Sequence, residues 1–223
     1  MNAARLCAVV PVKEVAQAKQ RLAGMLSASQ REQLALAMFE DLLMALASEL
    51  SDILVVTVDP AAIALASRFG ARVTPEGARD GHTGAVTTAA RRLVAEQRDL
   101  LAIPADIPLV QAADIRHLIA AHGDAPAFTI VPARDELGSN AILMSPADAV
   151  PLRFGDNSYF PHLAAARAQG IAPRVVRLPR IELDIDHPDD LALFQRTPSQ
   201  TRSRRLLDRW QADRVVAVAG QSE

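Results

Sequence analysis

The chain has 223 residues, of which 50% are apolar and only 4% aromatic, and its formal net charge is −2. That length supports one sizeable α/β domain with its own core. The near-neutral charge, with no basic stripe interleaved with aromatic residues, argues against a nucleic-acid partner. The single cysteine, Cys7, permits no internal disulfide and suits a reducing compartment. No apolar stretch is long enough to cross a membrane and no leader-like segment opens the chain, so we expect a cytoplasmic protein without a membrane partner.

Short apolar runs and helix signals alternate along the chain. Strands are predicted at residues 6–10, 53–58, 71–74, 100–103, 128–131, 141–144, 174–178 and 181–185. Helices are predicted at about residues 28–47, 60–70, 83–96, 112–121 and 158–170, and from 187 onward. The segment 75–82 has two glycines and no periodicity, which predicts a loop. This alternation predicts an α/β fold with a mostly parallel sheet covered by helices on both faces.

The composition changes near the end of the chain. From Thr197 onward Ser, Gln and Arg dominate, so we predict one domain over residues 1–196 and a partly helical C-terminal extension over residues 197–223. Leu206, Leu207 and Trp210 share one face of a helix, which would pack on the body of the protein or on a neighbouring copy. A homodimer is therefore one candidate assembly. The last few residues are expected to fray.

An acidic residue follows the most apolar of the predicted strands. Residues 100–103 read as a strand buried on both faces, Pro104 ends it, and Asp106 comes next. Ligands of open α/β sheets bind at this carboxyl end. A rigidly held carboxylate there suits Mg2+, which usually takes one or two protein carboxylates and phosphate oxygens. The alternative is that Asp106 only turns the chain or caps a helix.

Three cations, Lys13, Lys19 and Arg21, follow the first predicted strand and overlook the same edge of the sheet. Fixed positive charge beside a metal-binding carboxylate is what a triphosphate requires. The chain has neither a Walker sequence nor a G-x-G-x-x-G motif, which argues against P-loop and dinucleotide-binding proteins. An exposed basic loop without a ligand is the alternative.

A second acidic cluster lies in the predicted strand 181–185 and just after it. Asp184 and Asp186 would share one face of that strand, and one of them would complete the metal site with Asp106. Asp189 and Asp190 read as acids in the first turn of a helix, where the helix dipole favours them, and His187 as the residue that enters that helix.

Small and hydroxyl residues form a third group. Ser139 lies between Gly138 and Asn140, while Gly155 and Ser158 precede a predicted helix. Small residues let backbone N–H groups approach a ligand, so these positions favour a small phosphorylated anion. Ser158 is also a candidate side-chain N-cap.

Jointly these motifs resemble one family, the guanylyltransferases that act on 2-phospho-L-lactate, phosphoenolpyruvate or 3-phosphoglycerate in coenzyme F-420 biosynthesis. The resemblance covers the chain to about Phe194, in the family's order. It is carried by Pro11-x-Lys13, Lys19-x-Arg21-Leu22, Pro104-Ala105-Asp106-Ile107-Pro108-Leu109, Gly138-Ser139-Asn140-Ala141, Phe154-Gly155-x-x-Ser158 with His162, and Leu183-Asp184-Ile185-Asp186-x-Pro188-x-Asp190-Leu191.

The resemblance implies a Rossmann-like nucleotidyltransferase fold of the GT-A type, with GTP, Mg2+ and a small phosphorylated acid as partners. By position it implies Asp106 with Asp184 or Asp186 as metal ligands, and Lys13, Lys19 and Arg21 as catalytic cations. It also implies Pro11, Lys13, Gly81, His82 and Thr83 at the nucleotide, and Ser139, Gly155 and Ser158 around the acceptor. Two departures from the family's pattern leave the nucleotide base and the choice of acid open. The chain has Gly81-His82-Thr83-Gly84-Ala85 in place of a Gly-Leu-Asn-Ala-like loop, and Ser139 in place of Thr.

Other functions compete with this interpretation. A nucleotidyltransferase with a molybdopterin or sugar-acid phosphate as acceptor would need the same cations and carboxylates. A GT-A-type glycosyltransferase normally shows a D-x-D motif after the central strand, whereas Asp106 is followed by Ile107-Pro108. A ligand-binding protein that kept only the fold is a third class, and the intact carboxylates and basic loop argue against it.

Overall fold

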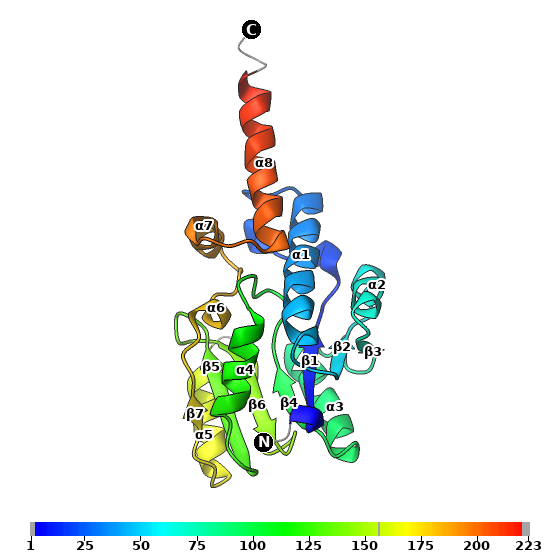
Figure 1. The fold of residues 1–223 in the computed structure, drawn as a ribbon, viewed down its shortest axis with the longest axis vertical. Coiled ribbons are helices and arrows are strands. Elements are labelled where there is room, and N and C mark those ends of the chain that lie inside the picture. The colour runs from blue at the N-terminus through cyan, green and yellow to red at the C-terminus, as the bar shows by residue number, and fades with distance from the viewer. Residues whose placement is uncertain (1–2, 156, 220–223) are drawn as a thin grey trace.

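A seven-stranded sheet with the order β3-β2-β1-β4-β6-β5-β7 forms the centre of the computed structural model, which describes residues 3–155 and 157–219 (Figure 1). The strands are β1 (Leu6–Pro11), β2 (Ile53–Val56), β3 (Arg72–Thr74), β4 (Asp99–Ala102), β5 (Ala127–Pro132), β6 (Ser139–Ser145) and β7 (Arg174–Val175). The helices are α1 (Ala28–Ala47), α2 (Pro60–Arg68), α3 (Gly81–Ala95), α4 (Ala112–Ala121), α5 (Tyr159–Ala168), α6 (Pro179–Glu182), α7 (Pro188–Arg196) and α8 (Arg202–Ala219). Three short 3-10 turns cover Ala3–Arg5, Val15–Gln17 and Gln20–Leu22.

Most neighbouring strands are parallel. β3, β2, β1 and β4 form a parallel block, β6 runs antiparallel to both β4 and β5, and β7 is parallel to β5. Every residue of β2 and β4 is buried, as expected for strands covered on both sides. The predicted mostly parallel α/β sheet is therefore confirmed.

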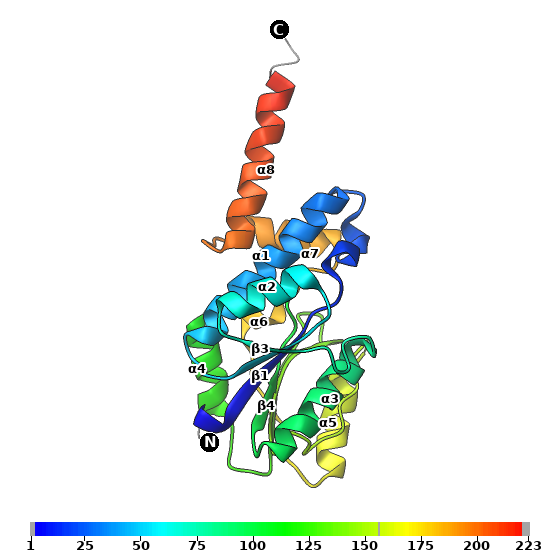
Figure 2. The same cartoon turned by 90° about the vertical axis from the view of Figure 1, so that its right-hand side faces the viewer.

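Helices cover both faces of the sheet (Figure 2). α1, α2 and α4 pack over one face in a cluster that includes Phe39 and Leu42, while α3 and α5 cover the other face around Val86 and Phe128. A capping box begins α1, because the Ser27 hydroxyl accepts from the Gln30 amide and the Gln30 side chain accepts from the Ser27 amide. Cys7 is fully buried in β1 as a packing residue with a free thiol.

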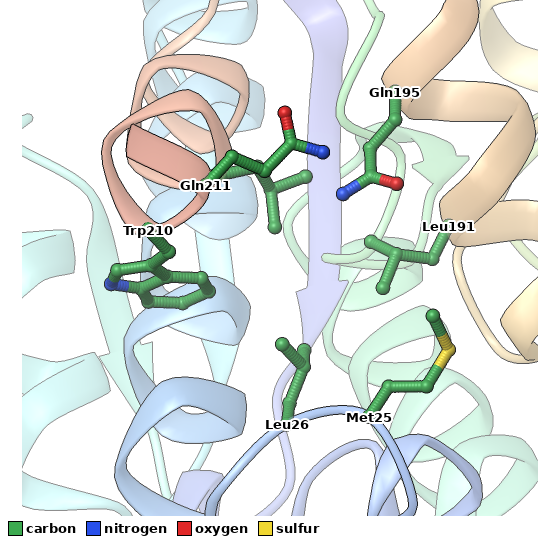
Figure 3. Close-up of a pocket in the computed structure, with 7 residues that line it drawn as sticks. Met25, Leu26, Leu191, Gln195, Trp210 and Gln211 are labelled. Carbon is green, nitrogen blue, oxygen red and sulfur yellow. The ribbon is translucent and has the colours of Figure 1, made fainter. Parts of the chain in front are cut away.

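A third apolar cluster holds the C-terminal helix against the body. Leu22, Leu26, Leu191 and Leu207 meet there, so Leu207 packs on the body of the protein, as one of the two predicted arrangements requires. Figure 3 shows a small pocket at this junction, between Leu26, Leu191 of α7 and Trp210 of α8. Beyond this contact α8 projects away from the sheet (Figure 1). The predicted fraying concerns residues 220–223, which lie outside the described residues.

The N-terminus of α8 is held by a buried carboxylate of α1. Asp41 accepts hydrogen bonds from the amides of Arg202 (2.7 Å) and Ser203 (2.9 Å) and from the Ser203 hydroxyl (2.6 Å). Amides at the start of a helix have no partner within the helix. Asp41 supplies that partner from another element, so α8 is fixed to α1 by polar as well as apolar contacts.

The predicted strand at 181–185 is wrong. Pro179 begins the short helix α6, because proline suits the first turn of a helix, and residues 183–186 follow without joining the sheet. Leu183 and Ile185 are nevertheless buried, while Asp184 and Asp186 are only half-buried. The alternation that resembled a strand therefore comes from an extended segment lying over an apolar cluster.

Several boundaries also differ from the predictions. α3 begins at Gly81, so Gly81 and His82 form its first turn and do not belong to a loop. β2 ends at Val56, β4 covers Asp99–Ala102, and β7 contains only Arg174 and Val175. None of the helices in the described ranges is both long and apolar enough to span a membrane.

Candidate functional site

Four segments meet at the carboxyl edge of the parallel strands. β1 ends at Pro11, Asp106 follows β4, and α3 starts at Gly81 after β3. β6 runs in the opposite direction, so its first residue, Ser139, lies at the same edge. The extended segment 183–186 joins them, since the Ile185 amide donates to the Asp106 carbonyl at 3.2 Å. The topology thus gathers the residues that the sequence motifs single out.

Lys19 binds two of the predicted metal ligands. Its ammonium donates to Asp106 Oδ2 at 2.6 Å and to Asp186 Oδ1 at 2.9 Å, and its side chain is 8% exposed. Burial disfavours the charge of Lys19, but the two carboxylates outweigh burial and raise its pKa to about 12. Arg21, which is largely exposed, approaches Asp186 Oδ2 at 3.6 Å and His187 Nε2 at 3.4 Å. Lys19 and Arg21 therefore lie at the acidic cluster.

Asp184, unlike Asp186, forms no ion pair with Lys19 or Arg21. Asn140 donates to Asp184 Oδ1 at 3.0 Å. Burial and the nearby charge of Asp106 raise the pKa of Asp184 to about 6. Asp106 Oδ1 is buried and accepts no hydrogen bond from any residue that the structure describes. A divalent cation would stabilise Asp106 and Asp184 together, because it would bind the unpartnered Asp106 oxygen and favour the charged form of Asp184.

The donor set fits Mg2+ in one particular way. The described residues contain no group of three or more His, Cys, Asp or Glu side chains placed to hold a metal. Mg2+ usually binds one or two carboxylates and completes its shell with water and phosphate oxygens. Asp106 and Asp184 suit that mode, because Lys19 binds only one oxygen of Asp106, whereas Lys19 and Arg21 approach both oxygens of Asp186.

Lys13 is a cation of the site that the described residues leave without a partner. It follows Pro11 and Val12 at the end of β1, is exposed, and within the described ranges makes no hydrogen bond or ion pair. Lys13 lies close enough to His82 to oppose protonation of that ring electrostatically. Burial is the largest cause of the shift. Burial and the charge of Lys13 lower the pKa of His82 to about 4, although the charge of Asp106 raises it. His82 Nε2 is buried and unpartnered.

Thr83 does not offer a free hydroxyl to a nucleotide. Thr83 Oγ1 accepts from the Phe154 amide at 2.9 Å and donates to the Phe154 carbonyl at 3.2 Å. The Phe154 ring lies between two imidazoles, with centroids 4.3 Å from His82 and 5.3 Å from His162. The first turn of α3, predicted as a nucleotide contact, is thus joined to the segment before α5.

The two predicted acceptor serines contact each other. Ser158 Oγ donates to Ser139 Oγ at 3.2 Å, and Ser139 Oγ lies 2.9 Å from His162 Nδ1. The predicted side-chain N-cap by Ser158 is wrong, because its hydroxyl makes no bond to the first turn of α5 and turns toward Ser139. Gly155 is exposed and has φ +132°, a conformation that favours glycine.

Sequence reasoning underestimated three residues of this site. His162 was only part of a motif, yet it links Ser139 to the Arg153 amide, which donates to His162 Nε2 at 2.9 Å. Asn140 orients Asp184, and Phe154 is held by Thr83. His162 lies four residues after Ser158, on the same face of α5, and that spacing was the available signal.

Comparisons with known proteins identify relatives along nearly the whole chain. It is 38% identical over 202 residues to a phosphoenolpyruvate guanylyltransferase of Roseiflexus castenholzii, covering 90% of this chain and 93% of that protein. A 3-phospho-D-glycerate guanylyltransferase of Colwellia psychrerythraea is 36% identical over 83% of this chain and 89% of its own. A 2-phospho-L-lactate guanylyltransferase of Methanothermobacter thermautotrophicus is 33% identical over 91% and 90% respectively.

Solved structures share the fold. A proposed nucleotide-diphospho-sugar transferase from Desulfovibrio desulfuricans G20 matches with a TM-score of 0.74 at 18% identity, covering 95% of this chain and 96% of that one. A nucleotidyl transferase from Methanothermobacter matches with a TM-score of 0.58 at 17% identity, over 85% and 94%. The family model described as "Guanylyl transferase CofC like" matches residues 6–214. The protein is accordingly a nucleotidyltransferase, and it belongs to the CofC-like guanylyl transferase family.

Proposed function

We propose that the protein transfers GMP from GTP to a small phosphorylated C3 acid and releases pyrophosphate, as a step of coenzyme F-420 biosynthesis. Phosphoenolpyruvate, 2-phospho-L-lactate and 3-phosphoglycerate are the candidate acceptors, because the relatives carry these three names. The observation that carries the proposal is the unpartnered Asp106 oxygen beside Asp184, at the sheet edge that also holds Lys13 and the serine pair. This is a site for a metal-bound triphosphate next to a second anion.

The chemistry needs no protein nucleophile. A phosphate oxygen of the acceptor attacks the α-phosphorus of GTP, a new P–O–P bond forms, and the bond between the α-phosphorus and the bridging oxygen to the β-phosphorus breaks. Pyrophosphate leaves with that electron pair. Asp106 and Asp184 would hold Mg2+, which neutralises phosphate charge when bound. Catalysis by the chain is then positioning and electrostatic stabilisation.

Each cation has a distinct role in this proposal. Lys13, which is exposed and has no partner among the residues that the structure describes, contacts the phosphates and stabilises the charge that develops on pyrophosphate. Lys19 holds Asp106 and Asp186 in place, and Arg21 adds positive charge at the edge of the same cluster. Pro11 and the first turn of α3, with Gly81, His82 and Thr83, form the nucleotide side.

The acceptor side consists of Ser139, Ser158 and Gly155. Two hydroxyls and an exposed glycine amide are suited to an anion that carries both a phosphate and a carboxylate. Ser139 lacks the methyl group of the threonine usual in the family, which leaves slightly more room for the acid. A cytoplasmic location suits GTP and the free Cys7 thiol, and a homodimer remains the proposed assembly.

Pyrophosphate release tests the reaction and the acceptor together. The protein is incubated with GTP, Mg2+ and each of the three acids in turn, and we expect release with at least one. CTP or ATP in place of GTP tests the base, and EDTA should abolish turnover. Pyrophosphate release only with a molybdopterin or a sugar-acid phosphate would favour the competing function. If pyrophosphate is released with none of the acceptors, the proposal is contradicted.

A further inference from the structure

His162 makes one hydrogen bond with each of its ring nitrogens. Nδ1 lies 2.9 Å from Ser139 Oγ at the start of β6, and Nε2 accepts from the backbone amide of Arg153 at 2.9 Å. The side chain is 1% exposed, so no bulk water competes for either nitrogen. His162 therefore joins the two walls of the proposed acceptor pocket, the β6 wall and the 153–155 segment.

The Arg153 bond fixes the tautomer of the ring. A backbone N–H can only donate, so Nε2 must be the unprotonated nitrogen. A neutral imidazole then carries its proton on Nδ1 and donates it to Ser139 Oγ. A doubly protonated ring would place two N–H groups against each other at Arg153. Burial, with a smaller contribution from His82, lowers the pKa of His162 to about 4 and supports the neutral form.

This tautomer determines where the Ser139 proton points. Ser139 Oγ already faces two donors, His162 Nδ1 and the Ser158 hydroxyl at 3.2 Å. Its own hydrogen must therefore go to a third group, and the described residues supply no acceptor for it. A buried hydroxyl whose proton is left for an outside acceptor is a preset donor for an anionic ligand.

We propose that His162 is a positioning residue for the acceptor: it holds Ser139 as a hydrogen-bond donor to the phosphorylated acid and fixes the Arg153–Gly155 segment opposite. This proposal rests on the proposed function, because it assumes that the acid binds at the serine pair. The same segment is fixed from the other side by Thr83, which bonds both backbone groups of Phe154. His162 acts on the acid through Ser139 and does not itself contact substrate.

Two isosteric variants separate the two bonds. In His162→Asn the amide NH2 takes the place of Nδ1–H, so it keeps the bond to Ser139 and loses the bond to Arg153. In His162→Gln the amide oxygen reaches the place of Nε2, so it keeps the bond to Arg153 and loses the bond to Ser139. Measuring the apparent KM for GTP and for phosphoenolpyruvate, or for whichever acid the wild type uses, is the readout. We expect His162→Gln to raise the KM of the acid about tenfold and leave that of GTP within twofold. His162→Asn should stay within about threefold for the acid, because Thr83 still holds the segment through both backbone groups of Phe154.

Combining His162→Gln with Ser139→Ala tests whether both act through one contact. We expect the double variant to be no worse than Ser139→Ala alone, because both changes remove the same donor. Additive losses, or equal increases in the KM of GTP and of the acid, would overturn the proposal.

His122 provides the matched control. It is also a buried neutral histidine between polar partners, with Nδ1 2.8 Å from Thr129 Oγ1 and Nε2 3.1 Å from Ser145 Oγ. Ser145 ends β6 and Ser139 begins it, so His122 lies roughly 20 Å from the acceptor pocket. His122→Gln should lower stability without changing either KM by more than twofold. An acid KM that rises as in His162→Gln would mean a general structural effect and overturn the proposal.

A measurement independent of turnover completes the test. Histidine-selective 15N NMR of the full wild-type chain at neutral pH, with the His162 signals assigned by their loss in His162→Gln, should show a neutral ring protonated at Nδ1. A ring protonated at Nε2, or at both nitrogens, would overturn the proposal. If none of the acids supports turnover, the proposed function fails while the tautomer result still stands, so the two failures are distinguishable.

Discussion

Lys19 adopts a left-handed backbone conformation, with φ 53° and ψ 40°, and places its ammonium between Asp106 and Asp186. A non-glycine residue in this region costs on the order of 1 kcal/mol and stays there only where surrounding contacts fix it. Sequence reasoning grouped Lys19 with Lys13 as cations for phosphate. In the structure their situations differ, because Lys19 forms two ion pairs, whereas Lys13 forms none with the described part of the chain. Lys19 is thus paired within the protein, whereas Lys13 is exposed to an incoming ligand.

Asp106→Asn should lower turnover by at least about a hundredfold while the protein stays folded, because the amide keeps the shape but not the charge that would hold Mg2+. Steady-state pyrophosphate release at saturating Mg2+ measures this. Asp189→Asn is the control, since Asp189 is an exposed acid in the first turn of α7. Near-normal turnover of Asp106→Asn would contradict the metal site.

Lys13→Ala should reduce kcat more than tenfold and change the unfolding free energy by no more than about 0.5 kcal/mol, since Lys13 makes no contact that the fold needs. The chain has only two lysines, Lys13 and Lys19, and Lys19 is buried in its ion pairs. A lysine-selective acylating reagent should therefore modify Lys13, inactivate the enzyme, and be blocked by GTP with Mg2+. Mass spectrometry locates the adduct. A higher KM for GTP with unchanged kcat would instead make Lys13 a uniform binding group.

Elements with complete local signals were predicted well. α4 covers Ala112–Ala121, as expected, and α1 begins at its capping box. Elements that depend on tertiary contacts were predicted less well. The start of α3 depends on Gly81, which has φ 72°. Residues 183–186 alternate in burial because they pack on a cluster formed by helices from other parts of the chain. That the motif residues gather at one edge of the sheet could be predicted, because the carboxyl ends of parallel strands meet there. Its hydrogen bonds, such as that from Asn140 to Asp184, join residues 44 positions apart and leave no local pattern.

Asp41→Ala should lower the unfolding free energy by about 1–3 kcal/mol, because two amides and a hydroxyl at the start of α8 lose their acceptor. Chemical denaturation followed by circular dichroism measures the loss. Trp210, the only tryptophan, lies in the same α8 contact and should report it by fluorescence. Asp208→Ala is the control, because Asp208 is exposed and forms its ion pair with Arg204 of its own helix. An unchanged midpoint for Asp41→Ala would mean that this cap contributes nothing.

At the scale of the whole molecule, the segments that carry the charged residues of the candidate site lead directly into the apolar cluster on which α8 packs. The chain passes from Lys19 and Arg21 to Leu22 and Leu26, and from Asp186 into α7 with Leu191. Helix α8 packs on both, and the family match extends to residue 214, into α8. The C-terminal helix is thus part of the framework that positions the site. The domain boundary at residue 196 stays a prediction.

Acid pH should destabilise the whole protein through its buried neutral histidines. Burial lowers the pKa of His122 to about 4, whereas an unfolded histidine titrates near 6.5. Between these values the unfolded chain binds a proton that the folded chain does not, so stability falls as pH falls through this window and is constant above it. Asp184 acts in the opposite direction, since its raised pKa makes the folded chain the better proton binder between about pH 4 and 6.

Comparing the wild type with His122→Gln isolates one histidine from these opposing groups. The wild type should be the more stable at pH 7.5, because glutamine cannot reproduce both the Thr129 and Ser145 bonds. Its advantage should shrink by about 1–2 kcal/mol at pH 5, since only the wild type carries the proton linkage of His122. Urea denaturation at pH 7.5, 6.5 and 5 gives the difference directly. A difference that stays constant with pH would mean that His122 titrates alike in the folded and unfolded chains.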